Sequence, residues 1–308
     1  MRILLTGSSG TIGTRLFESL SPHHELVGLD IRRNKWNPRL DVVTLKADLR
    51  NAGHLEGLSP EFDLIIHLAA NARVYELVER PELAFDNMLI NHNVLEYMRK
   101  KGIARVIYAS SREAYGNIMG RTAVAEDSVR LENCESPYAA SKMAGEAMIH
   151  AYGRTYGMDC VILRFSNVYG MYDDSDRVVP LWIRECMRGR NLTVYGRDKS
   201  LDFTYIDDAV DGVVRVVDRF EKAKGNTFNI ARGEEVRLLD VAERIKALLG
   251  CRSENVIRES RPGEVWKYKA DISKAERLLG FRPQVGIEEG LTRTVQWYLE
   301  RRSDFVGI

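Results

Sequence analysis

Two side chains four positions apart, Tyr138 and Lys142, form the pair with the clearest chemical potential in this sequence. Residues at this spacing share one face of a helix, so a helix here would bring the lysine ammonium beside the tyrosine phenol. A phenol titrates near pH ~10, and a neighbouring positive charge favours its ionised form. The pair could therefore act as a tyrosine base. The alternative, which the pair alone leaves open, is a surface Tyr and Lys on an amphipathic helix.

The elements that must position this pair can be predicted from its neighbours. Ser136 suits a helix N-cap and Pro137 suits the first helical turn, so we expect a helix from this point to about Tyr156. A buried strand is expected over 104–109, and Ser111 follows it. Ligands bind at the carboxyl ends of strands in open α/β sheets, which is where Ser111 would lie.

The first residues of the chain predict a strand, a glycine-rich loop and a helix. An apolar run over 2–6 is followed by Gly7, Gly10 and Gly13 and then by a helical pattern. Glycines allow the backbone to turn tightly and to approach a pyrophosphate, which the N–H groups and the dipole at a helix start stabilise. A second apolar run then ends in Asp30. This order of elements predicts a dinucleotide site rather than a simple turn.

The cofactor expected at this site is NAD. Asp30 lies near the position at which an acid meets the adenosine ribose hydroxyls, and its carboxylate would repel the extra phosphate of NADP. Arg32 and Arg33 are close enough to weaken this preference, unless they are solvated loop charges. Asp48, after an expected strand over 40–46, could meet the adenine, or it could be the N-cap of the following turn.

The remaining pattern predicts a doubly wound parallel sheet of the Rossmann type, an α/β fold. Strands over 63–70 and 160–165 alternate with a helix over 81–101, and His67 is expected to be a satisfied core histidine. After about residue 170 the pattern loosens into a smaller, mixed α/β domain. We therefore expect an NAD-binding domain over 1–170 and a substrate-binding domain over 171–308, with segments such as 193–220 returning to the first.

Composition excludes several classes of protein. The 308 residues are 44% hydrophobic, and 45 Lys and Arg against 44 Asp and Glu give a net charge of +1. The charges are interspersed, so neither nucleic acid nor a membrane surface is an expected partner. The four cysteines are far apart in the sequence and are expected to be reduced thiols, with no metal site. No signal segment or membrane-spanning run is evident, and a cytoplasmic location is expected.

The motifs together resemble a known family. They are the glycine loop over 6–13, the Ser110-Ser111 strand end, the Tyr138 and Lys142 pair, and the segments 164–170, 193–196, 203–208, 228–230 and 261–264. This ordered set resembles the extended short-chain dehydrogenases/reductases, and more narrowly the NAD-dependent sugar-nucleotide epimerase/dehydratase group typified by UDP-glucose 4-epimerase. The resemblance covers nearly the whole chain.

The resemblance implies a role for each motif. Tyr138 would take the proton of a sugar hydroxyl as hydride leaves for the nicotinamide, Lys142 would hold the nicotinamide ribose and lower the phenol pKa, and Ser111 would relay the proton. The implied NAD contacts are Gly7, Gly10, Thr11, Ile12, Gly13, Asp30, Asp48, Leu49, Leu68, Ala69, Ala70, Tyr138 and Lys142. The implied contacts to the nucleotide sugar, which we expect to be UDP-linked, are Ser111, Asn167, Tyr195 and Arg261.

Several positions depart from the pattern of the group. Thr11 replaces a larger residue, and Leu201 stands where many members carry a second arginine, so Lys199 could substitute for it at the diphosphate. For Asn167 and Arg261 the alternatives are a strand-end turn and a loop arginine that pairs with Glu264.

Glu113 leaves the reaction class open. Dehydratases and UDP-glucuronate decarboxylases of the group place a working glutamate at this position, and many epimerases lack an acid there. The adjacent residue is Arg112, which cannot serve as an acid but could pair with Glu113 or attract a hexuronate carboxylate. We expect a 4-epimerase, with a 4,6-dehydratase or a decarboxylase that uses Glu113 as the alternative. A non-catalytic NAD-binding module is a remote third reading, and a homodimer is the expected assembly.

Overall fold

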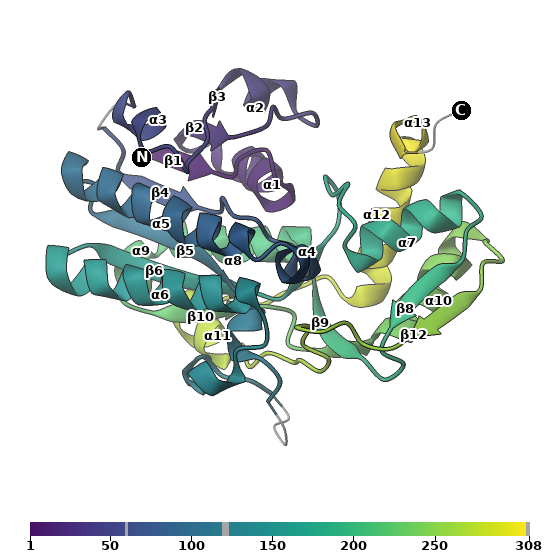
Figure 1. Ribbon diagram of the computed structural model, residues 1–308. Coiled ribbons are helices and arrows are strands. Elements are labelled where there is room, and N and C mark those ends of the chain that lie inside the picture. Colours follow the sequence, from purple (N-terminus) through teal and green to yellow (C-terminus); the bar gives the residue numbers. More distant parts are fainter. Residues whose placement is uncertain (59–60, 119–122, 306–308) are drawn as a thin grey trace.

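The computed structural model, which describes residues 1–58, 61–118 and 123–305, is built around a seven-stranded parallel sheet (Figure 1). The strand order is β10-β6-β5-β4-β1-β2-β3. The chain winds outward from β1 in one direction, reverses, and continues from β4 in the other. The predicted Rossmann-type sheet is confirmed. Its strands are β1 (Arg2–Thr6), β2 (Glu25–Asp30), β3 (Thr44–Lys46), β4 (Leu64–His67), β5 (Arg105–Ser111), β6 (Asp159–Phe165) and β10 (Thr227–Ile230).

Both faces of this sheet are buried. In β1, Ile3 and Leu5 belong to one hydrophobic cluster and Leu4 to another, as the alternation of side chains along a strand requires. On one face lie α5 (Glu82–Lys101) and α6 (Pro137–Tyr156), packed against each other (Figure 1). The other face carries α1 (Thr11–Leu20) and α8 (Ile206–Asp218), which also contact each other. Burial on both sides explains why the strands are continuous apolar runs.

The other helices and strands are shorter and flank this core. The remaining helices are α1 (Thr11–Leu20), α2 (Pro38–Val42), α3 (Gly53–Glu56), α4 (Val74–Glu79), α7 (Val178–Met187), α8 (Ile206–Asp218), α9 (Phe220–Ala223), α10 (Leu238–Leu249), α11 (Ser273–Leu279), α12 (Ile287–Glu300) and α13 (Arg302–Phe305). Among the described residues, none of these helices is long and apolar enough to cross a membrane.

The helix α6 forms where the sequence predicts it. The side chain of Ser136 accepts a hydrogen bond from the backbone N–H of Ala139, and Pro137 occupies the first turn. Gly145 then faces β5, where an added Cβ would lie 2.1 Å from the hydroxyl of Tyr108. This glycine therefore lets α6 approach the strand that ends at Ser111.

One predicted strand is wrong over part of its length. The run over 40–46 was expected to be extended, but the strand covers only Thr44–Lys46 and the preceding residues form α2. The side chain of Asn37 caps this helix by accepting from the N–H groups of Arg39 and Leu40, and Pro38 fills its first turn. A strong local start signal therefore outweighs the apolar run that follows it.

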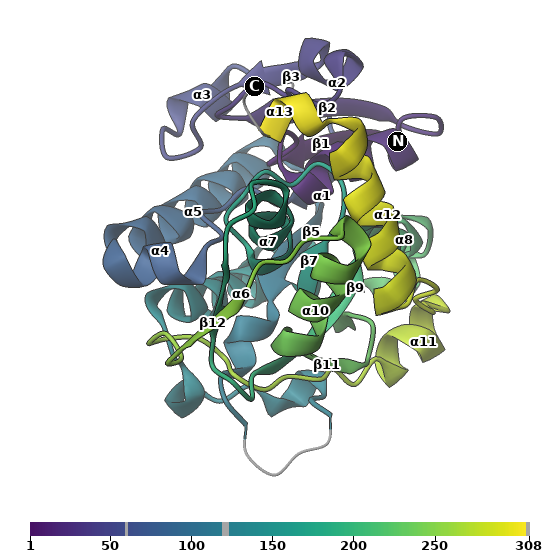
Figure 2. The ribbon, with the colours of Figure 1, turned by 90° about the vertical axis from the view of Figure 1, so that its right-hand side faces the viewer.

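The second half of the chain builds a separate group of elements beside the carboxyl ends of the main sheet (Figure 2). Here β7 (Asn167–Tyr169), β9 (Ser200–Tyr205) and β11 (Glu235–Arg237) form one small sheet, and β8 (Leu192–Tyr195) pairs with β12 (Asn255–Arg258). The helices α7, α10 and α12 cover them. Strand β10 instead pairs with β6 of the main sheet, and helix α8 packs against that sheet.

Candidate active site

The carboxyl ends of β1, β4 and β5 meet where the strand order reverses, which is the binding crevice of doubly wound sheets. The glycine loop after β1 is closely packed there. A Cβ on Gly13 would lie 2.2 Å from the carbonyl oxygen of Gly7, and a Cβ on Gly7 would lie 2.8 Å from the backbone nitrogen of Ala69. The loop thus brings bare backbone to the start of α1, as a pyrophosphate cradle requires.

The acid predicted to select the cofactor lies at the end of β2. Asp30 is buried, and its carboxylate accepts hydrogen bonds of 2.9 Å from the backbone N–H groups of Ser9 and Arg32. The carboxylate is therefore fixed beside the glycine loop. Among the ion pairs of the described residues, Arg33 reaches Asp41 rather than Asp30.

The other predicted dinucleotide contacts follow the carboxyl ends of β3 and β4. Asp48 follows β3, accepts the N–H of Arg50, and pairs with the Arg50 guanidinium at 2.6 Å, so it closes a local turn and is not the N-cap of α3. Leu49 is buried, and Leu68, Ala69 and Ala70 follow the end of β4.

His67, at the end of β4, is the expected core histidine: its Nδ1 lies 2.7 Å from the Thr6 hydroxyl, and burial lowers its pKa to about 3.

Ser111, Tyr138 and Lys142 converge at the end of β5. Tyr138 and Lys142 are both about 95% buried, and Ser111 is nearly so. Burial raises the pKa of the Tyr138 phenol, while a hydrogen bond with Ser111 and the charge of Arg177 oppose that rise. The structure thus brings together the three residues that the sequence singled out for proton transfer.

Lys142 is held between the tyrosine and the strand. Its Nζ donates to the carbonyl oxygen of Ala109 at 2.8 Å and lies 5.9 Å from the centre of the Tyr138 ring. Burial lowers the pKa of Lys142 to about 8, although the charge of Glu146 acts in the opposite direction. The ammonium is therefore anchored to backbone, close to the phenol but not hydrogen-bonded to it.

Behind this group, a buried ion pair ties α6 to β6. The guanidinium of Arg164 binds both carboxylate oxygens of Glu146, at 2.8 and 2.6 Å. Ser110 donates to the same carboxylate, and Arg164 also reaches the hydroxyl of Tyr115 at 3.0 Å. Because Ser110 precedes Ser111, this network fixes the strand end that carries Ser111.

Glu113 is paired with its neighbour. The Arg112 guanidinium lies 2.8 Å from Glu113 Oε1 and donates to Asn167 Oδ1 at 3.2 Å. Both members of the pair are buried, and the remaining atoms, Arg112 Nη1 and Glu113 Oε2, are buried without a partner. Burial raises the pKa of Glu113, and the charge of Arg112 offsets part of that rise.

A second ion pair adjoins the first. Lys199 Nζ contacts Glu264 Oε2 at 2.6 Å, so Glu264 is not the partner of Arg261 that the sequence left open. Leu201, on β9, is buried in the hydrophobic core. Lys199 is thus held by a carboxylate near Glu113.

Arg261 lies between two aromatic rings. Its guanidinium carbon is 3.8 Å from the ring centre of Tyr195, at the end of β8, and 4.4 Å from that of Tyr75, on α4. Among the described residues, no hydrogen-bond acceptor or carboxylate pairs with the guanidinium. Its N–H edge is therefore free for an anion. We call this trio the Arg261 clamp.

The sequence predicted Arg261 and Tyr195 as contacts to the nucleotide sugar, but it did not predict the contact of Tyr75 with Arg261. The available signal was an aromatic residue soon after the end of β4, in a segment that must border the crevice. The position of this aromatic residue in the sequence does not show which side chain its ring contacts.

A loop over 171–177 connects the second group of elements to the dinucleotide side; we call it the strap. Thr11 donates its hydroxyl to the carbonyl oxygen of Tyr172 at 3.1 Å, and Asp174 forms an ion pair with Lys35. Arg177 donates to the carbonyl oxygen of Ala72. The strap therefore contacts residues on both sides of the crevice.

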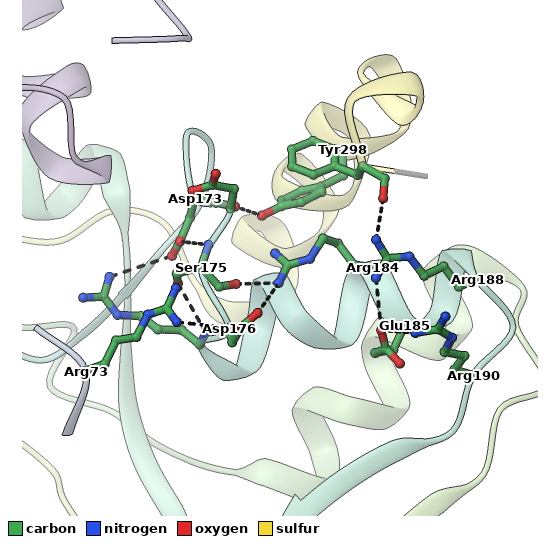
Figure 3. Close-up of polar contacts among 12 residues, drawn as sticks. Arg73, Asp173, Ser175, Asp176, Arg184, Glu185, Arg188, Arg190 and Tyr298 are labelled. Carbon is green, nitrogen blue, oxygen red and sulfur yellow. Dashed lines mark hydrogen bonds and ion pairs between the residues drawn. The ribbon is translucent and has the colours of Figure 1, made fainter. Parts of the chain in front are cut away.

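The strap is braced from behind by α7 (Figure 3). Arg184 donates to the carbonyl oxygen of Ser175 at 2.7 Å and to Asp176 Oδ1 at 3.0 Å, while Arg73 contacts the other oxygen of Asp176 at 3.1 Å. Tyr298, from α12, donates to the carbonyl oxygen of Asp173.

Within the part of the chain that the structure describes, no group of three or more His, Cys, Asp or Glu residues could hold a metal ion.

Comparisons with known proteins agree with this arrangement. Residues 3–231 match the model of the NAD dependent epimerase/dehydratase family. UDP-glucose 4-epimerase from Mycolicibacterium smegmatis is 30% identical over 316 residues, which cover 97% of this chain and 98% of that protein.

Solved structures share the whole fold. The crystal structure of UDP-glucose 4-epimerase from Thermotoga maritima with UDP-glucose has a TM-score of 0.90 at 26% identity and covers 98% of this chain and 100% of that one. The dTDP-glucose 4,6-dehydratase DesIV from Streptomyces venezuelae, with NAD bound, has a TM-score of 0.90 at 30% identity and covers 99% of each chain.

The buried network behind the crevice yields a stability prediction. The change Glu146→Gln removes the charge that compensates Arg164, and breaking a buried pair in this way costs about 3–5 kcal/mol. The free energy of unfolding, measured by urea denaturation, should fall by that amount. Glu289→Gln breaks the exposed pair with Arg293 and should change it by less than about 1 kcal/mol. Equal losses in the two variants would contradict a buried, structural role for Glu146.

Proposed function

Because the chain belongs to the NAD-dependent epimerase/dehydratase family, we propose that it is a nucleotide-sugar 4-epimerase, most simply one that acts on a UDP-linked hexose. The reaction passes through a transient 4-keto sugar and consumes no reductant overall. This proposal is supported by the buried Ser111, Tyr138 and Lys142 group and by the pairing of Glu113 with Arg112.

The glycine loop and Asp30 fit NAD. A Cβ at Gly7 or Gly13 would collide with the backbone of Ala69 or of Gly7 itself, so the tight loop needs glycine at both positions, and the Asp30 carboxylate is fixed beside this loop by the N–H of Ser9. In this proposal Thr11, Ile12 and Leu68 to Ala70 line the same site. When bound here, NAD would supply hydride transfer at the sugar carbon. The backbone of the loop and the start of α1 would hold its pyrophosphate.

The proton chemistry falls to the residues at the end of β5. Tyr138 takes the proton from the sugar 4-hydroxyl and later returns it, and Ser111, which hydrogen-bonds the phenol, relays it. Lys142, anchored on the carbonyl of Ala109, supplies a fixed positive charge near the phenol and a donor for the nicotinamide ribose. Because burial raises the pKa of the Tyr138 phenol, the hydrogen bond with Ser111 and the charge of Arg177, which act against that rise, are needed for a working base.

The state of Glu113 is the observation that favours an epimerase. A dehydratase needs a carboxylate that is free to remove the C5 proton and an acid that protonates the leaving oxygen. Here Arg112 holds Glu113 Oε1 at 2.8 Å, and Arg112 is itself a permanent cation. Glu113 then compensates a buried arginine that also orients Asn167.

A specific observation supports the dehydratase as second candidate. Glu113 Oε2 is buried without a partner, and burial raises the pKa of this carboxyl. An unpartnered carboxylate oxygen in a crevice is suited to proton abstraction.

The Arg261 clamp provides the site for the donor diphosphate. A guanidinium that packs on aromatic rings keeps its N–H groups available for charge-assisted bonds with phosphate oxygens. Asn167 and Tyr195 complete the proposed donor site. Because the Tyr75 ring also contacts the Arg261 guanidinium, we propose that Tyr75 is a positioning residue that acts through the arginine.

The base is tested by Tyr138→Phe. Loss of the phenol should lower kcat at least ~100-fold, the usual size of general acid–base catalysis, while NAD stays bound. NAD is measured as nucleotide released on denaturation, and turnover by NMR of the sugar. Tyr156→Phe, on an exposed part of the same helix, is the control and should leave kcat unchanged. A Tyr138→Phe enzyme with near wild-type turnover would remove this residue from the mechanism.

The reaction class is tested on a panel of UDP-, dTDP- and GDP-sugars with product identification by NMR. We expect the C4 epimer, and Glu113→Gln should keep kcat within ~10-fold, whereas a dehydratase would lose at least ~100-fold. The double variant Arg112→Met/Glu113→Gln controls for the unpaired charge that the single change leaves. A 4-keto-6-deoxy sugar or a pentose as product would overturn the epimerase proposal.

The clamp is tested by Tyr75→Ala. Loss of one stacked face should raise KM for the nucleotide sugar ~3- to 30-fold, the range of a cation–π contact, with little change in kcat or Tm. Tyr75→Phe keeps the ring and should restore the wild-type KM. If Tyr75→Ala lowers kcat and leaves KM unchanged, Tyr75 does not act through Arg261.

A further inference from the structure

Two cysteines that are far apart in the sequence meet in the second half of the chain. Cys186 lies in the last turn of α7, and Cys251 follows Gly250, which ends α10. Their Sγ atoms are 2.7 Å apart, well inside the normal contact distance of two unbonded sulfur atoms, and both thiols are free. The sequence predicted four reduced thiols that are far from one another, because nothing in the spacing of residues 186 and 251 indicates this contact.

The surroundings of the pair make the two thiols unequal. Cys186 is 4% exposed, whereas Cys251 is only partly buried. Burial raises the pKa of Cys186, and its hydrogen bond to Cys251 raises it further. For Cys251 burial acts upward too, but its hydrogen bonds with Cys186 and Ser253 outweigh it and leave the pKa below the ordinary value. Cys251 is therefore the sulfur that ionises more readily and that solvent reaches.

We propose that Cys186 and Cys251 form a reversible intramolecular disulfide that links α7 to α10. With a peroxide as oxidant, the Cys251 thiolate attacks one peroxide oxygen, and the other leaves as hydroxide. The Cys186 thiol then displaces the oxygen from the resulting Cys251 sulfenic acid, so that an S–S bond forms and water is released. Two electrons pass from the sulfurs to the peroxide. A dithiol reductant reverses the reaction.

The fold limits what this bond would change. α7 and α10 already pack against each other (Figure 2), and the sulfurs need to move by less than ~1 Å to reach bonding distance. No residue of the proposed proton-transfer group belongs to either helix. The bond would tie residues that are distant in the unfolded chain, and so we expect it to stabilise the native state rather than to rearrange the crevice.

The other two cysteines provide internal controls. Cys160 donates to backbone carbonyls in the core, and burial raises its pKa to about 11. Cys134 is exposed, and its thiol points to the carbonyl of Ser136. Among the described residues neither contacts another sulfur, so neither should enter an intramolecular disulfide.

The test is oxidation of the native full-length protein with hydrogen peroxide, followed by alkylation of the remaining thiols and peptide mass mapping. We expect one cross-linked peptide pair that contains Cys186 and Cys251, with the intact mass lower by two hydrogen atoms, and recovery of both free thiols after dithiothreitol. Tm should rise by about 5 °C on oxidation. Cys186→Ser and Cys251→Ser should abolish the cross-link and the rise in Tm, and Cys134→Ser should keep both.

Two results would overturn the proposal. One is full alkylation of Cys186 and Cys251 in unfolded samples of peroxide-treated protein. The other is a cross-link that joins two chains or contains Cys134. Because the measurement uses mass and melting temperature and no sugar substrate, its outcome is independent of the proposed epimerase activity.

Discussion

The buried ion pair between Arg164 and Glu146 is the interaction on which the crevice depends. It joins the centre of α6 to β6, and the same carboxylate receives Ser110 from β5. Three elements that follow one another in the chain, β5, α6 and β6, are thereby fixed together beside the residues that we propose transfer protons. A charge pair in this position is costly to desolvate and adds little net stability, but its bidentate geometry permits one arrangement of helix and strand. At Gly145 the Tyr108 side chain of β5 packs directly on the helix, where an added Cβ would lie 2.1 Å from its hydroxyl, and this contact restricts the arrangement further.

Much of this architecture could be predicted from local signals. Ser136 and Pro137 mark the start of α6, the spaced glycines mark the loop before α1, and apolar runs mark strands that are buried on both faces. These features follow from short-range rules of capping and periodicity. The error over 40–46 has the same origin, because Asn37 and Pro38 start a helix that the apolar run concealed. The contacts of residues that are distant in sequence were not accessible: Tyr75 on Arg261, Lys199 on Glu264, and the two thiols.

The charges around the crevice separate the members of this family more finely than the fold does. Solved structures of a UDP-glucose 4-epimerase and of a dTDP-glucose 4,6-dehydratase share the fold of this chain, so the fold identifies the family but not the reaction. In our proposal the surroundings of one carboxylate, Glu113, decide the reaction class. In this chain an arginine adjacent in sequence holds that carboxylate and at the same time orients Asn167. The expected homodimer and the division at residue 170 stay predictions.

The Arg261 clamp has a consequence for how the molecule moves. The Tyr75 ring lies on α4, the helix that follows strand β4 of the main sheet. The arginine and the Tyr195 ring belong to the second group of elements. In the proposed function, an anion that binds the guanidinium favours the arrangement in which all three side chains are stacked. Affinity for the donor and the relative position of the two halves are then linked equilibria: each biases the other by the same free energy. In the proposed function, binding of the phosphate end of the substrate would therefore favour one relative position of the two groups of elements between which the sugar end lies.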